Sequence, residues 1–376
     1  MNVTPAPAAA APAAGSDQHG QTATAALVPF VRGSVRHVEP VTLDKSLTFT
    51  SSAQLVQLAE LPAFGFVRSI LLTVEVTGGT GTAAVYKEDA PWSIIQSFTL
   101  LDTNGAALVE LSGYELFLAH LVSGTVANAD PTQHPHYVTP STAGNFTFTL
   151  RVPIEISPRD ALGALPQMNA AQPYQFRLVM AQKEDVYSTD PTGMPTAVRW
   201  TAELEAWSKP AAVDIVGRPV ASEPPAIQTN QFWTRTQIGI NSGQFVARWP
   251  RMGNVLRNVV CVFRNGSGVR TSSAFPDPTT LALDSNQLVV QRRRTQPMYF
   301  VERTPSLSAA CRAMLNGVVV FDFTSDWNGA LGFEMRDQWL PTTGATRLEL
   351  TGSWGTSGTL TVMTNDVSLK GNPYVD

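Results

Sequence analysis

Short stretches of alternating polar and apolar residues run through most of the chain. The clearest are Phe146-Thr147-Phe148-Thr149-Leu150, the segment 200–207 and the segment 347–351. They are rich in Val, Ile, Thr and Phe, and Gly, Pro, Asn and Asp separate them. Alternation with a period of two turns one face of a strand toward a core and the other toward solvent. We therefore predict an all-β protein whose antiparallel sheets pack face to face as sandwiches.

Three places carry helix-start signals. Ser112-Gly113-Tyr114-Glu115 has the spacing of a capping box and opens an apolar helix that should end near Gly124. Thr304-Pro305 places a capping Thr before a Pro at the first helical position, and this second helix should end at Gly317. Ser157-Pro158-Arg159-Asp160 predicts a third, shorter helix of about two turns.

The same order of signals occurs twice, in residues 68–207 and in residues 257–364. Each copy has an apolar strand, a glycine turn, a second strand, a helix start and further strands. The matching marks, first copy against second, are 67–74 and 256–262, Gly78-Gly79 and Asn265-Gly266, 99–104 and 281–286, Ser112 and Thr304, 146–154 and 318–323, Ser157 and Ser325, and Leu165-Pro166 and Leu340-Pro341. Any two β-rich segments share some features, but a shared order of this length favours a whole domain that occurs twice. We expect two sandwiches that superpose, each with a helix at the equivalent place.

The remaining segments set the predicted boundaries. Residues 1–26 are rich in Ala, Pro, Gly and Thr, contain no Lys or Arg and cannot form a core alone. Residues 28–41 are more apolar and could be a first strand or a surface extension. We assign 1–40 to an N-terminal arm, 41–210 to the first domain, 211–225 to a linker that contains Pro224-Pro225, and 226–376 to the second domain.

Composition narrows the possible functions. The 376 residues include 43% hydrophobic but only 15% charged residues, which favours a chain that covers much of its surface in an assembly. A formal net charge of −4 and the absence of Lys and Arg from residues 1–26 give no general attraction to nucleic acid. No window is apolar enough for a membrane-spanning helix, and we expect no secretion signal. Cys261 and Cys311 are too few for a disulfide framework; they could pair with each other, but two free buried thiols are the preferred expectation.

Candidate chemistry is sparse. His134-Pro135-His136 is the best metal candidate, but it lacks a third ligand at a supporting spacing, so an exposed loop is the preferred interpretation. Lys87-Glu88-Asp89 and Lys183-Glu184-Asp185 could supply paired carboxylates, but solvated turn charges are the preferred interpretation. We therefore assign no catalytic, cofactor-binding or metal-binding residue, and expect no cofactor and no enzymatic activity.

Two further residue groups are open to more than one interpretation. Arg292-Arg293-Arg294 is the one basic run; it could contact phosphate or an acidic neighbouring subunit, although a solvated strand end is the default. The aromatic residues Trp92, Trp200, Trp207, Trp249 and Trp354 fall mostly in predicted strands, and we expect them in the cores.

One stretch carries a family resemblance. The residues Pro91-Trp92-Ser93-Ile94-Ile95-Gln96-Ser97-Phe98-Thr99-Leu100-Leu101-Asp102-Thr103-Asn104-Gly105, with Leu111 to Glu115 after them, look like the strand, turn, strand and helix entry of double jelly-roll major capsid proteins. Together with the duplicated halves and the uncharged arm, the chain resembles this family over residues 40–376. Its length best resembles the capsid proteins of tailless, tectivirus-like bacteriophages.

The resemblance implies a fold of two tandem eight-stranded jelly rolls, although about seven strands can be counted in each half. It also implies a homotrimeric, pseudo-hexagonal capsomer in an icosahedral virion, with an internal membrane around double-stranded DNA. The partners would be copies of this chain, neighbouring capsomers, and minor capsid or membrane-side proteins that bind the arm. Assembly would take place in the host cytoplasm, without sequence-specific nucleic-acid binding.

Two other functions stay open at this point. A secreted enzyme or lectin with two jelly rolls that acts on glycans would need a signal peptide and usually disulfides. A vertex or receptor-binding protein of the same virion would be elongated, whereas two matched halves favour a tile.

Overall fold

The structure is a computed structural model that describes residues 27–123, 130–249, 252–271, 276, 278–284, 287–292, 307–324 and 336–368. Its first half is a sandwich of two four-stranded antiparallel sheets. The strands of one sheet are, in spatial order, β1 (Arg36–Leu47), β11 (Ala197–Trp207), β3 (Phe66–Thr77) and β7 (Phe146–Pro153). Those of the other are β2 (Gln54–Glu60), β9 (Gln175–Met180), β5 (Ile95–Leu101) and β6 (Ala107–Leu111).

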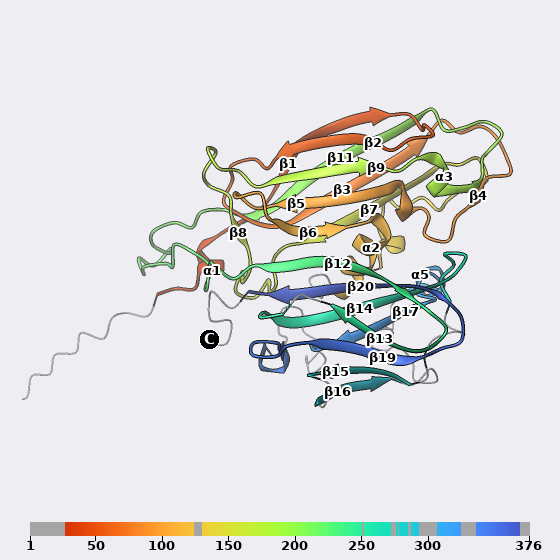
Figure 1. The fold of residues 1–376 in the computed structure, drawn as a ribbon. Helices are drawn as coiled ribbons and strands as arrows, with labels where there is room; N and C mark the ends of the chain where they lie inside the picture. The colour runs from red at the N-terminus through yellow and green to blue at the C-terminus, as the bar shows by residue number, and fades with distance from the viewer. Residues whose placement is uncertain are drawn as a thin grey trace, which may run out of the picture.

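The second half repeats this arrangement with the same connections. One sheet contains β12 (Gln231–Ile240), β20 (Gly358–Val367), β14 (Val255–Asn265) and β17 (Val318–Asp322). The other contains β13 (Gly243–Trp249), β19 (Leu348–Trp354), β15 (Thr279–Leu283) and β16 (Gln287–Arg292). Each half is thus an eight-stranded jelly roll, which confirms the predicted fold class and supplies the strand that the sequence count lacked in each half (Figure 1).

The minor elements connect these strands. The short strands are β4 (Val85–Tyr86), β8 (Leu165–Pro166), β10 (Tyr187–Thr189) and β18 (Leu340–Pro341). The helical segments are α1 (Phe30–Gly33), η1 (Trp92–Ile94), α2 (Gly113–Val122), η2 (Pro131–Gln133), α3 (Lys183–Val186), α5 (Ala309–Ala313) and η3 (Arg336–Gln338).

Strand register shows that the duplication extends to single residues. In the first half, Glu205 pairs with Ser69 and Ala206 with Val67, so Arg68 is the extra residue of a bulge in β3. In the second half Arg257 is the extra residue of the equivalent bulge in β14, between Asn258 and Leu256. The predicted match of Leu165-Pro166 with Leu340-Pro341 is also confirmed, because β8 pairs with β3 and β18 with β14 at these bulges.

The helices agree with the sequence in part. Helix α2 follows β6 and starts at the predicted capping box, where the Glu115 carboxylate accepts the Ser112 N–H at 2.6 Å. Gly113 is required at its first position because a Cβ there would lie 1.9 Å from the Trp92 carbonyl oxygen. Helix α5 follows β16 at the equivalent place but is shorter and is capped by Ser308. The predicted start at Thr304-Pro305 lies outside the described residues.

The predicted third helix was wrong. Ser157 instead forms an isolated bridge with Leu162, and the Asp160 carboxylate accepts the Leu162 N–H at 3.2 Å. Ala161 has a positive φ of 63°, which a helix cannot accommodate. The segment is therefore a tight turn between β7 and β8.

The first sandwich begins inside the range 1–40 that the sequence assigned to the arm. Strand β1 starts at Arg36 and pairs with β11 from Trp207 onward. Before it, α1 places Phe30 edge-on against Phe66, with ring centroids 5.0 Å apart. A buried aromatic residue attaches this part of the chain to the sandwich, which agrees with the first strand or surface extension that the apolar residues of 28–41 allowed.

Two large apolar cores fill the two sandwiches, and the larger one also joins the halves. The larger core fills the first sandwich and continues into the second half through Trp233, Val260, Cys311, Val318 and Met363. The smaller core fills the second sandwich. None of the helices in the described part of the chain is long and apolar enough to cross a membrane.

Candidate functional site: the junction of the two halves

The two sandwiches meet along one edge of each, and this contact region is called the junction. Strand β6, at the edge of the first half, lies parallel to β12 of the second half, with Val109 opposite Trp233. The two sheets thereby join into one nine-stranded sheet, which also includes the short strand β18. The pairing covers strand edges that would otherwise present unpaired backbone groups.

A buried arginine connects the halves through hydrogen bonds and ion pairs. Arg270, whose side chain is 2% exposed, follows β14 and reaches into the first half. Its Nε lies 3.0 Å from Asp89 Oδ1, and its guanidinium donates to the Tyr114 hydroxyl and to the carbonyl of Met314. The Tyr114 hydroxyl itself donates to Met314 at 2.6 Å. Burial is the largest cause that raises the pKa of Tyr114, so this hydroxyl stays a donor.

Glu88 and Asp89 have a different role from the one expected of turn charges. Glu88 accepts the backbone N–H of Arg270 at 2.6 Å, and Asp89 also forms an ion pair with Arg264 at 2.8 Å. Glu88 is exposed, as expected of a turn charge, but the interpretation of Lys87-Glu88-Asp89 as solvated turn charges was wrong for Asp89, which is partly buried between two arginines. Both acids fix the position of one sandwich relative to the other.

Helix α2 lies at the centre of the junction, and all ten of its residues are buried. Figure 1 shows α2 and α5 where the two sandwiches meet. Glu115 of α2 forms an ion pair with Arg235 of β12 at 3.3 Å. Trp92 stacks on Phe117 with ring centroids 4.8 Å apart, and its Nε1 donates to the Met314 sulfur at 3.3 Å.

A second group of hydrogen bonds joins the start of η2 in the first half to the start of α5 in the second half. Asp130 is 3% exposed and accepts the Ser308 N–H at 2.7 Å, while the hydroxyls of Thr132 and Ser308 lie 2.9 Å apart. Burial alone would raise the pKa of Asp130, but hydrogen bonds from Thr132 and Ser308 hold that pKa below its ordinary value. Both α5 and η2 are thus fixed by one carboxylate.

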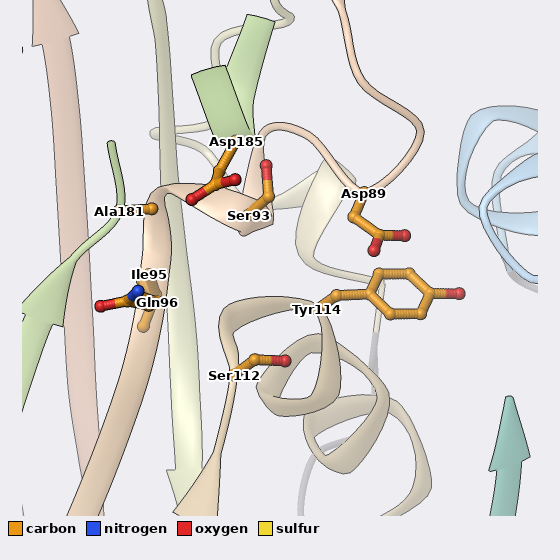
Figure 2. A pocket seen from close by; sticks show the side chains of 8 residues that line it. All are labelled: Asp89, Ser93, Ile95, Gln96, Ser112, Tyr114, Ala181 and Asp185. Carbon is orange, nitrogen blue, oxygen red and sulfur yellow. The ribbon is translucent and has the colours of Figure 1, made fainter. Parts of the chain in front are cut away.

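A pocket of about 180 Å³ lies beside this junction, between η1 and the start of α2. Its lining includes one acid from each triplet, Asp89 and Asp185, with Ser93, Ser112 and Tyr114 (Figure 2). The two carboxylates lie on different sides of the view, Asp89 above the Tyr114 ring and Asp185 near Ala181. Asp89 forms ion pairs with both Arg264 and Arg270, so two cations already neutralise this carboxylate. The pocket therefore lacks the arrangement that glycosidic hydrolysis requires.

The two histidines of the metal candidate lie in an exposed loop. Their rings are edge-on with centroids 5.4 Å apart, and the His136 N–H donates to His134 Nδ1 at 3.3 Å. Burial is the largest cause that lowers the pKa of His134, with His136 next. Within the described residues, no group of three His, Cys, Asp or Glu side chains could hold a metal ion.

Replacing both histidines, His134→Ala with His136→Ala, should change the free energy of unfolding by no more than ~0.5 kcal/mol, as for other exposed positions. Chemical denaturation with and without a chelator measures this. A larger loss would contradict the assignment of both histidines to an exposed loop, and a chelator effect seen only in the parent protein would assign a metal to the loop.

The other sequence candidates are placed as follows. Lys183 is in α3 and forms an ion pair with Asp190. Trp92, Trp200, Trp207 and Trp354 are buried, as expected. Cys261 and Cys311 are free and buried, and burial raises the pKa of both thiols. Arg292 ends β16, whereas Arg293 and Arg294 lie outside the described residues.

No family model matches this sequence, and no curated protein sequence matches it. Several solved structures do resemble the fold. The major capsid protein of Sulfolobus Turreted Icosahedral Virus aligns with a TM-score of 0.59 at 14% identity, covering 90% of this chain and 98% of the other. The major capsid protein of bacteriophage PM2 aligns at 0.53 and 10% identity, over 89% and 97%. The PBCV-1 virus capsid protein aligns at 0.57 and 10% identity, over 91% and 98%.

These alignments span both sandwiches and nearly the whole of each chain. At such low identity the shared property is the fold, with its two jelly rolls. The chain therefore has the double jelly-roll fold of viral major capsid proteins.

Proposed function

We propose that this chain is the major capsid protein of a tailless icosahedral virus. The observation that carries the proposal is an alignment over about nine tenths of the chain with capsid proteins that have both sandwiches. The junction supports it, because buried ion pairs and a continuous core make the two sandwiches one rigid unit. A rigid pair of similar sandwiches suits a tile, whereas no described cluster suits catalysis.

The finer part of the proposal comes from the sequence. Three copies form a pseudo-hexagonal capsomer, and the capsomers form a tectivirus-like shell around an internal membrane and double-stranded DNA. The arm, residues 1–26, binds neighbouring capsomers or minor membrane-side proteins in the virion. The chain makes no sequence-specific contact with nucleic acid, and the shell assembles in the host cytoplasm of a bacterium.

The mass in solution tests the capsomer. Multi-angle light scattering should give three times the 40.5 kDa chain mass across micromolar concentrations, since a tile should bury more than the ~1,600 Å² of an ordinary interface. A stable monomer would contradict the proposal and favour the glycan-binding or vertex alternatives.

Deleting residues 1–26 tests the arm. We expect soluble trimers with an unchanged melting temperature, because the segment contains few large apolar side chains and ordering it costs backbone entropy. Shells examined by electron microscopy should close poorly or with altered curvature. A truncated protein that fails to fold, or one that builds normal shells, would assign the arm another role.

A further inference from the structure

The pairing of two edge strands at the junction inside one chain has an equivalent that two copies of the chain can form with each other. It joins the last strand of one sheet in the first half, β6, to the first strand of the second half, β12. Strand β16 has in the second half the position that β6 has in the first, and β1 has in the first half the position that β12 has in the second. Among the described strands, each of these is the end of its sheet and has a neighbour on one side only. Figure 1 shows them at opposite ends of the molecule.

Register identifies the residue of β1 that corresponds to Trp233. In the second half, Trp233 of β12 pairs with Asn365 of β20, which pairs with Asn258 beside the bulge. In the first half, Val38 of β1 pairs with Glu205 of β11, which pairs with Ser69 beside the equivalent bulge. Val38 is therefore the counterpart of Trp233.

The counterpart of Val109 follows from a second pair of bulges. In β6, Val109 pairs with Leu100, and Ala107 follows as the next paired residue. In β16, Val290 pairs with Leu281, and Leu288 follows as the next paired residue. Val290 therefore has the position in β16 that Val109 has in β6.

Exposure differs sharply between the two equivalent positions. Trp233 is 0% exposed because the junction covers it, whereas Val38 is 56% exposed. Val35, just before β1, is 60% exposed. An apolar side chain on an unpaired edge strand is a site for strand addition. Strand β1 therefore has the same position in its sheet as β12, but its outer edge lacks the partner that β6 provides for β12 among the described strands.

We propose that β16 of one copy lies parallel to β1 of the next copy, with Val290 opposite Val38. This inference rests on the trimer proposed above and identifies the strands through which its adjacent copies bind each other. Internal and intermolecular junctions then alternate around the ring, so that six sandwiches are joined by two versions of one contact. Such a head-to-tail interface closes without leaving a free edge of this kind.

Charge supports this register. With Val290 opposite Val38, Arg292 comes opposite Pro40, which pairs with Glu203 of β11. Glu203 is exposed and Glu39 is partly exposed, and the sequence continues from Arg292 with two more arginines. In this register Arg292 of one copy comes beside acidic residues of the next copy, which agrees with the acidic neighbour that the sequence left open. Pro40 has no N–H to donate, so the pairing stays short, as it is at Val109.

Disulfide cross-linking of the double variant Val38→Cys with Val290→Cys tests the proposal. Opposed residues on adjacent strands lie ~4.8 Å apart, within the range that a disulfide spans. After mild oxidation, a denaturing gel without reductant should show covalent trimers and nothing larger. Each single variant should run as a monomer, since Cys261 and Cys311 are buried.

The matched control is Val38→Cys with Val246→Cys. Val246 is also 56% exposed and lies on β13, the opposite end strand of the sheet that contains β16. This variant should give no covalent trimer. A second variant, Val38→Asp, should raise the concentration at which the trimer dissociates by about tenfold or more, while Val246→Asp should not.

The outcomes separate the two proposals. A trimer by light scattering that cross-links through Val246, or not at all, would overturn the contact and leave the capsomer standing. Covalent products larger than a trimer would overturn ring closure. A monomeric parent protein would overturn the capsomer itself, together with this contact.

Discussion

Replacing Arg270 with Met should lower the free energy of unfolding by roughly 3–5 kcal/mol, the usual loss when one partner of a buried ion pair is removed. The guanidinium has 2% exposure, forms an ion pair with Asp89 and donates hydrogen bonds to the Tyr114 hydroxyl and the carbonyl of Met314. Met fills a similar volume, so the loss would come from carboxylates and a carbonyl left without a donor. Urea denaturation followed by tryptophan fluorescence measures it.

The control is Arg199→Met. Arg199 also pairs with two acids, Asp44 at 3.0 Å and Glu75 at 3.7 Å, but it is exposed on the outer face of the first sandwich. Its replacement should change stability little, because solvent screens exposed pairs. If both variants lost the same free energy of unfolding, burial at the junction would not increase the contribution of Arg270 to stability.

The Arg270 variant should also change the shape of the transition. In the parent protein the larger core continues from the first sandwich into the second half, so the halves should unfold together. With the polar centre of the junction broken, we expect the second half to unfold at a lower urea concentration than the first. A single transition merely shifted to lower urea would mean that the apolar contacts alone couple the sandwiches.

The features that could be predicted from the sequence are those that depend on residues close together in the chain. Alternation identified most strands, and the paired marks located β8 and β18 on equivalent bulges. The capping box of α2 was correct because Ser112 and Glu115 act within one helical turn. At the bulges, Arg68 stacks on Trp207 and Arg257 on Trp339, but those partners are far away in the sequence, and no pattern links them.

The junction was not predicted, because its contacts join residues that are distant in the chain. Glu88 and Asp89 look like any charged turn until Arg264 and Arg270 meet them. One signal could have indicated it. The sequence of α2, Gly-Tyr-Glu-Leu-Phe-Leu-Ala-His-Leu-Val, is apolar on all sides, which is typical of a helix enclosed by two bodies.

The same helix carries the second large prediction, a loss of stability in mild acid. His120 is 9% exposed, and its Nδ1 accepts the Arg151 N–H at 3.0 Å, so this nitrogen carries no proton in the fold. Burial, with smaller contributions from the charges of Arg151 and His134, lowers the pKa of His120 to about 3, while Asp130 opposes the shift. Protonation in the fold would require this hydrogen bond to break.

The direction follows from proton linkage. Unfolded His120 titrates near its ordinary pKa of ~6.5 and folded His120 near 3, so between these values the unfolded chain binds more protons. Stability from this residue is therefore intact above pH ~6.5 and is lost progressively as the pH falls below it. By pH 5 the loss should be ~2 kcal/mol.

His120→Asn isolates this contribution, because the amide oxygen can still accept the Arg151 N–H but does not titrate. The variant should be less stable than the parent at pH 7 and lose ~2 kcal/mol less between pH 7 and pH 5, as measured by urea denaturation at each pH. The control His136→Gln replaces an exposed imidazole and should keep the parent's pH dependence. If His120→Asn and the parent lose equal stability over this range, the buried imidazole is not the group that destabilises the fold in acid. Asp130 at the junction could not account for such a loss, because its pKa lies below the ordinary value of 3.8 and its contribution is therefore lost only at lower pH.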